Sequence, residues 1–118
     1  MANEISTSTN FTFQKNGNPP QAWTANGTIT VSGNYFVSGV QNIGTTDETV
    51  SLGDIGTVGW VLLKNLDGTN YVTAGSDGSV YPIKLKAGEE IKTRWNGAAV
   101  HLKANTAACN VAYLIVED

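Results

Sequence analysis

Charged residues are scarce in this sequence, and neither sign dominates. They make up 14% of the 118 residues, against roughly 25% in an ordinary soluble domain. The 7 basic and 10 acidic residues give a net charge of −3, which argues against a dedicated nucleic-acid binder because such proteins carry an excess of basic residues. The length suits one domain and is too short for two independent cores, so we do not expect a multidomain enzyme.

Cysteine and long apolar stretches are also lacking. Cys109 is the only cysteine, so no internal disulfide can form. The longest apolar run, residues 58–63, is far below the ~20 residues needed to cross a bilayer. The first five residues lack the basic and apolar segments of a signal peptide. We therefore expect a protein without a membrane segment or signal peptide that is made in the cytoplasm.

The residues that are abundant favour strands and turns. The sequence has 14 Thr, 13 Gly and 12 Asn, all poor helix formers, whereas its 11 Val and 7 Ile favour strands. Glycine accompanies most of the turn signals, which recur at short intervals along the chain, and it allows the positive φ that tight turns need. The composition predicts an all-β protein.

Ten segments of strand character lie between the turns. They are residues 5–13, 27–31, 35–43, 48–52, 59–65, 70–73, 80–85, 89–95, 100–104 and 110–117. This spacing predicts a single-domain antiparallel β-sandwich or jelly-roll-like fold, with a small barrel as the alternative.

The N-terminal residues differ from the rest. Residues 1–25 are polar, contain Pro19 and Pro20, and show little alternation. We expect residues 1–25 to form an extended arm or connecting segment and residues 26–118 to form the β-sandwich domain.

Alternation is clearest on either side of Ala87 and Gly88, which predicts a hairpin. One face of it would carry Tyr81, Ile83, Leu85, Ile91, Thr93 and Trp95. The other would carry the basic residues Lys84, Lys86, Lys92 and Arg94. These four are a candidate interaction site for an acidic protein surface or a phosphate-bearing glycan, the ordinary alternative being a solvated sheet face.

Two segments are continuously apolar, residues 58–63 and 111–116. Such runs are typical of strands that are covered on both faces. The domain core accounts for one face. A loop, a neighbouring segment or another subunit would cover the other, and the last possibility predicts a homo-oligomer.

No residue pattern indicates a catalytic, metal or cofactor site. His101 has no second histidine to accompany it, and no basic residue next to Cys109 in the sequence would lower the thiol pKa. The carboxylate pairs 47–48 and 89–90 alternate across a strand and lie beside turns. The glycines of residues 53–59 lack the ending of a phosphate loop, and the two Asp-Gly turns at 67–68 and 77–78 lack further calcium ligands. We expect no enzyme activity, no cofactor and no metal.

The aromatic residues divide between core and surface. Trp60 and Trp95 lie on apolar faces, which predicts core positions. Trp23 lies beside Pro19 and Pro20, and it is the better candidate for an exposed or interface residue.

Part of the chain resembles a known class of proteins. Residues 59–72 (GWVLLKNLDGTNYV) and 81–89 (YPIKLKAGE), with 102–106 (LKANT) and 113–118 (YLIVED), resemble small structural proteins of tailed bacteriophages. The resemblance covers the C-terminal half and rests on strand and turn motifs; residues 1–25 have no counterpart. It implies a β-sandwich component of the virion that is present in many copies and acts by contact.

Two functions from different classes follow. The first is a non-enzymatic virion structural protein, most plausibly a capsid decoration or head-fibre subunit, which contacts capsid or tail proteins and forms a homo-oligomer, with a trimer favoured. The second is a tail- or fibre-associated receptor-binding or carbohydrate-binding β-domain that recognises a host-surface glycan. A small hydrolase would need two acidic residues, or a nucleophile with His101, in one cleft, and we do not expect this function.

Overall fold

Strands and loops make up all of the described part of the chain. The computed structural model describes residues 2–118, which form ten strands paired only in the antiparallel sense. No helix in this part of the chain is long and apolar enough to cross a membrane. The described residues fall into two compact units, one ending at Ser32 and the other covering Gly33–Asp118. The prediction of an all-β protein is confirmed.

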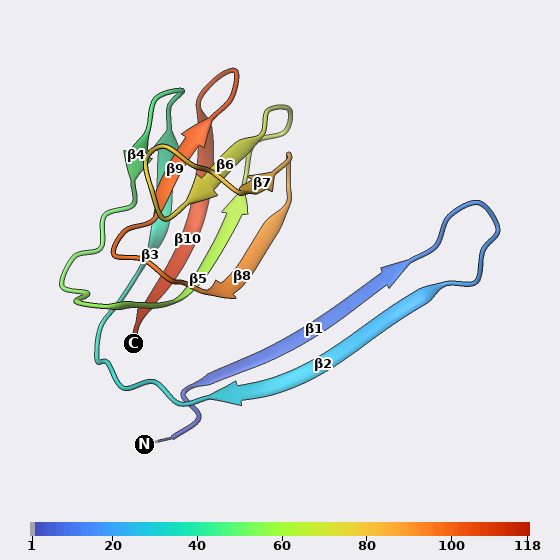
Figure 1. Ribbon diagram of the computed structural model, residues 1–118, viewed down its shortest axis with the longest axis horizontal. Coiled ribbons are helices and arrows are strands. Elements are labelled where there is room, and N and C mark those ends of the chain that lie inside the picture. The colour runs from blue at the N-terminus through green and yellow to red at the C-terminus, as the bar shows by residue number, and fades with distance from the viewer. Residues whose placement is uncertain (1) are drawn as a thin grey trace. The chain divides into compact units, whose positions relative to one another are not determined.

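The first unit is a two-stranded hairpin (Figure 1). Strands β1 (Ile5–Phe13) and β2 (Gln21–Ile29) pair along nine residues each, from Ile5 opposite Ile29 to Phe13 opposite Gln21. In the connecting loop, Asn16 and Gly17 have φ values of 56° and 73°, and the Asn18 N–H donates to the Lys15 carbonyl over 3.2 Å. Two successive residues of positive φ are what a type I′ turn requires, and Asn-Gly is its preferred pair.

The expected boundary at residue 25 falls inside β2. The strand predicted at 27–31 instead begins at Gln21, and the unit extends to Ser32. Residues 21–26 (QAWTAN) show little alternation of polar and apolar residues, so their strand conformation depends on pairing with β1, whose partner residues lie 8–18 positions away in the sequence.

The second unit contains eight strands in two sheets (Figure 1). They are β3 (Phe36–Ile43), β4 (Glu48–Thr49), β5 (Val58–Asn65), β6 (Val72–Gly75), β7 (Ile83–Leu85), β8 (Glu90–Arg94), β9 (His101–Ala104) and β10 (Cys109–Glu117). The first sheet has the order β3-β10-β5-β8, and the second has the order β4-β9-β6-β7. Strands β3 and β4 therefore form one edge of the unit, and β7 and β8 form the other.

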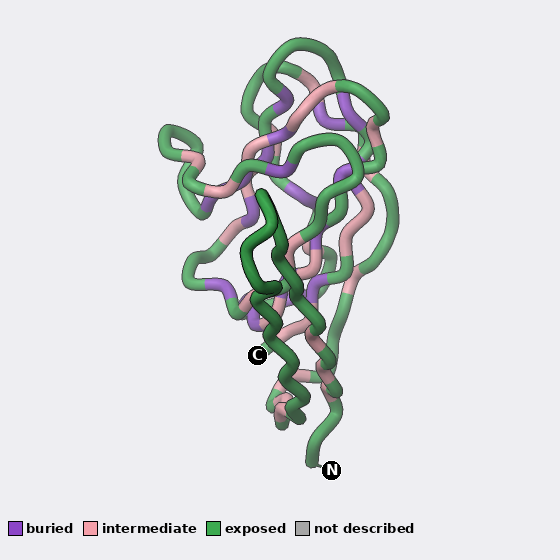
Figure 2. Tube along the Cα trace, turned by 90° about the vertical axis from the view of Figure 1, so that its right-hand side faces the viewer, coloured by how far each residue is buried: buried purple, intermediate pink, exposed green. Residues whose placement is uncertain are grey.

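Alternate residues of both sheets contribute to one hydrophobic core. The first sheet supplies Val61, Leu63, Val111 and Ile115, and the second supplies Val72, Ala74, Leu102 and Ala104, all essentially inaccessible to water. Figure 2 shows these buried positions in purple within the second unit, whereas the hairpin strands are mostly exposed. Burial of apolar area on this scale is the main stabilising term for such a unit.

The predicted hairpin around Ala87 and Gly88 is wrong in its pairing. The tight turn is present, with the Glu89 N–H donating to the Lys86 carbonyl over 3.0 Å and Gly88 at a φ of 79°. However, β7 pairs with β6 in the second sheet, and β8 pairs with β5 in the first. The chain thus crosses from one sheet to the other, so the apolar sides of β7 and β8 face each other across the core.

Candidate functional site

The sheet crossover divides the predicted basic site. Lys84 lies on the outer face of the second sheet, with its Nζ 4.2 Å from the centre of the Tyr71 ring. Lys92 and Arg94 lie on the outer face of the first sheet, and Lys86 lies in the turn between them. The four residues share an edge of the unit but not a face, so the prediction of a single basic face is wrong.

The two tryptophans predicted to lie in the core, Trp60 and Trp95, have different environments. Trp95 is buried, and its Nε1 donates to the Ala99 carbonyl over 2.9 Å, which agrees with the predicted core position. Trp60 is only half-buried and lies on the outer face of the first sheet, opposite Arg94. The Arg94 guanidinium is 5.9 Å from the centre of the Trp60 ring and 3.3 Å from the Asp118 carboxylate. Placing Trp60 in the core was therefore wrong.

The hairpin has one apolar face and one polar face. Phe11 pairs with Trp23, and these side chains are 65% and 64% exposed. Opposed residues of an antiparallel pair share a face, so this face continues through the pairs Thr9–Ala25 and Thr7–Gly27 to Ile5 and Ile29. Serine, threonine and asparagine fill nearly all of the opposite face, through the pairs Ser6–Thr28, Ser8–Asn26, Asn10–Thr24 and Thr12–Ala22.

An isolated two-stranded hairpin is at best marginally stable in water. The apolar face of this one, which includes Phe11, Phe13 and Trp23, is open in the structure. A partner that covered this face would remove the aromatic side chains from water and stabilise the strands at the same time. Trp23, predicted as an interface residue, therefore lies on a surface suited to that role, near the loop end of the hairpin.

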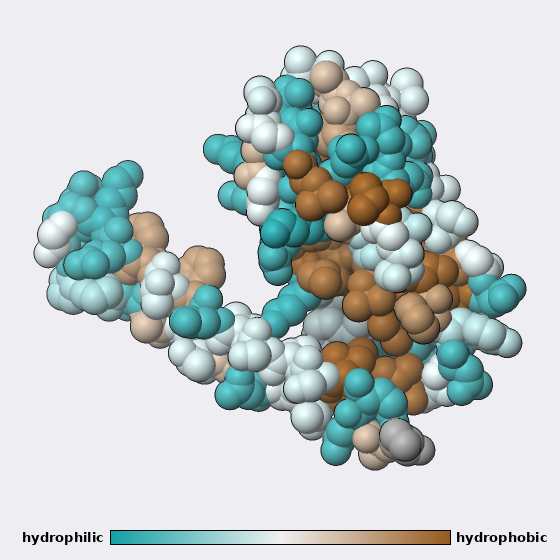
Figure 3. Space-filling view, turned by 180° about the vertical axis from the view of Figure 1, so that it is seen from behind, coloured by the Kyte–Doolittle hydropathy of each residue, from teal (hydrophilic) through white to brown (hydrophobic). Residues whose placement is uncertain are grey.

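The outer face of the first sheet is the second uncovered apolar surface. Reading across the strands β3, β10, β5 and β8, its three rows are Phe36–Val116–Trp60–Arg94, Ser38–Leu114–Leu62–Lys92 and Val40–Ala112–Lys64–Glu90. Phe36 is 67% exposed and Leu114 is 38% exposed. Figure 3 shows hydrophobic side chains gathered on this side of the second unit. We refer to these three rows as the outer face.

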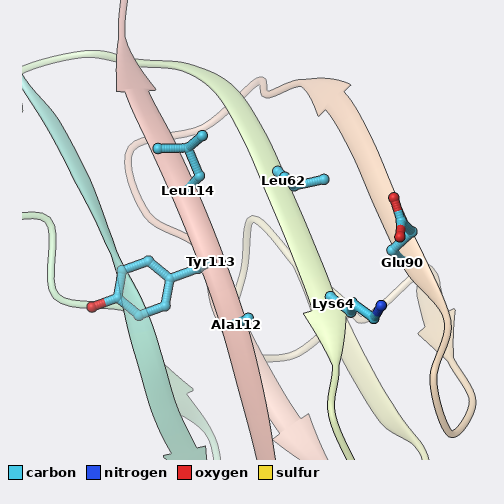
Figure 4. Close-up of a pocket in the computed structure, with 6 residues that line it drawn as sticks. All are labelled: Leu62, Lys64, Glu90, Ala112, Tyr113 and Leu114. Carbon is cyan, nitrogen blue, oxygen red and sulfur yellow. The ribbon is translucent and has the colours of Figure 1, made fainter. Parts of the chain in front are cut away.

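A shallow hollow lies within the outer face (Figure 4). Leu62 and Leu114 border it on neighbouring strands, and the paired residues Lys64 and Glu90 lie at its β8 side. Its volume of about 180 Å³ is below the several hundred Å³ of a typical small-molecule site. The hollow fits one or two side chains of a protein partner better than a metabolite.

A polar cluster of Asp47, Tyr81 and His101 brings together three segments that are distant in the sequence. The His101 Nδ1 lies 3.0 Å from Asp47 Oδ2, and the Tyr81 hydroxyl donates to Asp47 Oδ1 and lies 2.9 Å from the Gly78 carbonyl. The Tyr81 hydrogen bond and then that of His101 lower the pKa of Asp47. Hydrogen bonding to Asp47 raises the pKa of Tyr81 to about 12.

No partner for His101 was evident from the sequence, because Asp47 lies 54 positions away. An aspartate that orients a histidine is one part of a catalytic triad, but a triad also needs a nucleophile on the other ring nitrogen. Cys109 does not serve, because it is buried in the core and burial raises the pKa of its thiol. What the geometry supports is a cross-link between the β3–β4 loop, the residue 78–81 turn and β9.

Metal-ligand groupings are likewise missing from the described part of the chain. Within residues 2–118, no three His, Cys, Asp or Glu side chains group in a way that would hold a metal ion. The surfaces that distinguish this protein are therefore the apolar face of the hairpin and the outer face.

Comparison with known proteins adds no further assignment. No family model, no curated protein and no solved structure matches this chain.

Proposed function

We propose that this chain is a non-enzymatic structural protein of a tailed-phage virion, a capsid decoration or head-fibre subunit that acts by protein–protein contact. The observation that carries the proposal is the hairpin of residues 5–29, whose apolar face contains the Phe11–Trp23 pair and is open to water. A subunit that attaches to a larger particle needs such a surface and needs no active site.

The strand order of the second unit supports the same proposal. We infer that its two sheets form a β-sandwich of the jelly-roll type, because strands numbered 1–8 in chain order are arranged 1-8-3-6 and 2-7-4-5. Jelly rolls are common in viral capsid and lectin domains. Because a fold alone does not assign a function, the main support for the proposed function is the apolar face of the hairpin and the outer face, which are both uncovered.

Attachment in many copies suits weak individual contacts. Copies that are linked on one particle, or to one another, bind with an avidity that exceeds the affinity of a single contact. We propose that the hairpin contacts a capsid protein, with a tail protein as the other possible partner, and that the protein is localised in the virion.

Co-sedimentation with undecorated phage heads tests the proposal. We expect the full-length protein to bind with a saturating, fixed number per capsomer. Replacing both aromatic residues, Phe11→Thr with Trp23→Thr, should lower the affinity at least tenfold, because burial of two aromatic side chains stabilises a contact by more than about 1.4 kcal/mol. Threonine keeps the strand propensity of both positions.

The matched control changes the polar face of the same strands. Asn10→Thr with Asn26→Thr introduces the same residue at two exposed positions of the hairpin and should leave head binding unchanged. Failure of the full-length protein to saturate the heads would refute the proposal, as would equal loss of binding in both double variants.

A tail- or fibre-associated glycan-binding domain is the second candidate. The exposed Phe11–Trp23 pair favours it, because sugars stack on open aromatic rings. Binding to host-cell surfaces that is lost after glycosidase treatment and in the Phe11→Thr/Trp23→Thr variant, combined with no binding to heads, would support this candidate in place of the first.

A further inference from the structure

We propose that the outer face is a self-association surface, covered by a second copy of this chain whose acidic β3–β4 edge meets the basic β8 side of the first. The inference deepens the proposed function by naming a partner, and it rests on that proposal for its virion setting. Its test uses purified protein without phage heads, so each proposal can fail separately.

The outer face has the composition of an interface centre. On β3, β10 and β5 its side chains are largely apolar or aromatic, including Phe36, Val40, Leu62 and Leu114. Solvent-facing positions of an antiparallel sheet are normally polar, and the outer face of β8, with Glu90, Lys92 and Arg94, follows that rule. The apolar side chains at the solvent-facing positions of β3, β10 and β5 depart from this rule, which indicates that a partner covers them.

The size of the outer face indicates how a partner would cover it. Four strands about 4.8 Å apart and three rows about 6.8 Å apart span roughly 400 Å². Each partner in a standard protein interface contributes about 800 Å². A stable contact must therefore extend from the outer face onto a neighbouring edge of the unit.

The two edges of the unit have opposite charge. Residues 33–57, which include β3, β4 and the loop next to β3, contain Asp47, Glu48 and Asp54 and no lysine or arginine. The place of this loop is shown by Gly53, where an added Cβ would lie 3.3 Å from Val37 of β3. At the other edge, residues 83–95 carry four basic residues, Lys84, Lys86, Lys92 and Arg94, against two acidic ones, Glu89 and Glu90.

Because the two edges carry opposite charge, the acidic edge of one copy is complementary to the basic edge of another. When the acidic edge of one copy lies along the β8 side of another, opposite charges meet, and in this arrangement the second copy extends from β8 over the apolar residues of the neighbouring strands β5 and β10. Electrostatic complementarity of this kind sets the orientation of partners and disfavours other arrangements. A head-to-tail contact forms a ring when the rotation between copies closes, and we propose a closed ring with three-fold symmetry.

Solution mass is the first test. By light scattering at ~100 μM, where a complex with a micromolar Kd is mostly assembled, we expect a defined oligomer, a trimer for the closed ring. Leu114→Lys and, separately, Phe36→Lys should raise the dissociation constant at least tenfold. Because Phe36 is 67% exposed, its replacement removes little packing within the fold.

The matched control is Ala107→Lys, which introduces the same residue at an exposed apolar position in the loop between β9 and β10, outside the three rows of the outer face. This variant should associate as the unmodified protein does. A monomeric unmodified protein would overturn the proposal. So would dissociation of Ala107→Lys to the same extent as Leu114→Lys.

Charge reversal tests the orientation. Asp54→Lys and Lys92→Glu should each weaken association about threefold or more, and the double variant should recover most of that loss because each contact again joins opposite charges. A double variant that is weaker than either single variant would overturn the head-to-tail arrangement. If the protein is monomeric but still binds phage heads, the self-association proposal fails and the proposed function stands.

Discussion

At the scale of single residues, Asn65 is a buried polar residue whose side chain makes three hydrogen bonds. It is fully inaccessible, its Nδ2 donates to the carbonyls of Asn70 and Leu85 over 2.9 and 3.1 Å, and its Oδ1 accepts from the Asp67 N–H over 2.9 Å. One side chain thus joins β5, its following turn and β7. A buried amide is stable only when its hydrogen bonds are satisfied, as they are here.

Replacing Asn65 should be costly. We expect Asn65→Ala to lower the free energy of unfolding by about 2–4 kcal/mol, because it leaves buried carbonyls without donors and opens a cavity. Urea denaturation measures this loss. Asn110→Ala is the control: Asn110 is exposed and accepts one hydrogen bond from Asn42, so its loss should cost less than about 1 kcal/mol. Similar values for the two variants would contradict this account of Asn65.

The Asp47 cluster predicts a pH-dependent contribution to stability. Hydrogen bonds from Tyr81 and His101 lower the pKa of Asp47 in the folded state below its ordinary value of 3.8. The folded state therefore favours the ionised carboxylate. This contribution is fully present above the unfolded-state pKa and is lost as the pH falls through the lower folded-state pKa.

The corresponding measurement compares the unmodified protein with Asp47→Asn in urea between pH 7 and pH 2. We expect the unmodified protein to be more stable at neutral pH and the difference to shrink below about pH 4. A difference that stays constant over this range would show that the carboxylate charge is not responsible. Tyr81→Phe, which removes the leading hydrogen bond, should reduce the same pH-dependent difference.

At the scale of elements, the turn between β7 and β8 directs the chain from one sheet to the other. Gly88 has a φ of 79°, a conformation that L-residues adopt at a cost, and its N–H donates to the Asn65 carbonyl over 3.1 Å. The space around it is open, since an added Cβ would have no neighbour within 4 Å. Only the backbone conformation therefore opposes a side chain here.

Because a side chain at position 88 would be opposed by the backbone conformation and not by neighbouring atoms, a substitution there measures the cost of that conformation alone. Gly88→Ala should lower the free energy of unfolding by about 1–2 kcal/mol, the cost of the left-handed conformation for a non-glycine residue. Gly68→Ala is the matched control, because its surroundings are equally open and its φ is not in the left-handed region. We expect little change there. Equal effects of the two substitutions would argue against the strain at Gly88.

At the scale of the whole molecule, self-association would couple stability to concentration. Any partner that binds only the folded state raises the apparent stability by mass action. We therefore expect the thermal midpoint to rise measurably over about a hundredfold increase in protein concentration, as followed by circular dichroism. The midpoint of Leu114→Lys should be independent of concentration. A midpoint of the unmodified protein that does not move would count against assembly through the outer face.

The all-β class, the bounds of several strands and the side on which some of their residues lie follow from the sequence alone. The scarcity of helix formers and the Asn-Gly, Asp-Gly and Ala-Gly turns predicted an all-β chain. The prediction of strand 5–13 matches β1 residue for residue, and that of 59–65 misses only the first residue of β5. Alternation also predicted correctly that Leu85 and Trp95 point inward, because the two-residue period of a strand decides which side chains share a side.

Tertiary structure alone decided which strands are neighbours. The period of a strand is the same whether its partner lies beside it or across the core, so the sequence around Gly88 predicted a hairpin where the structure has a crossover. For the same reason the sequence did not predict the pairing of β1 with residues 21–26, the contacts of Asp47 with Tyr81 and His101, or the position of Trp60 on an outer face. Each depends on contacts between residues distant in the chain, which local propensity does not encode.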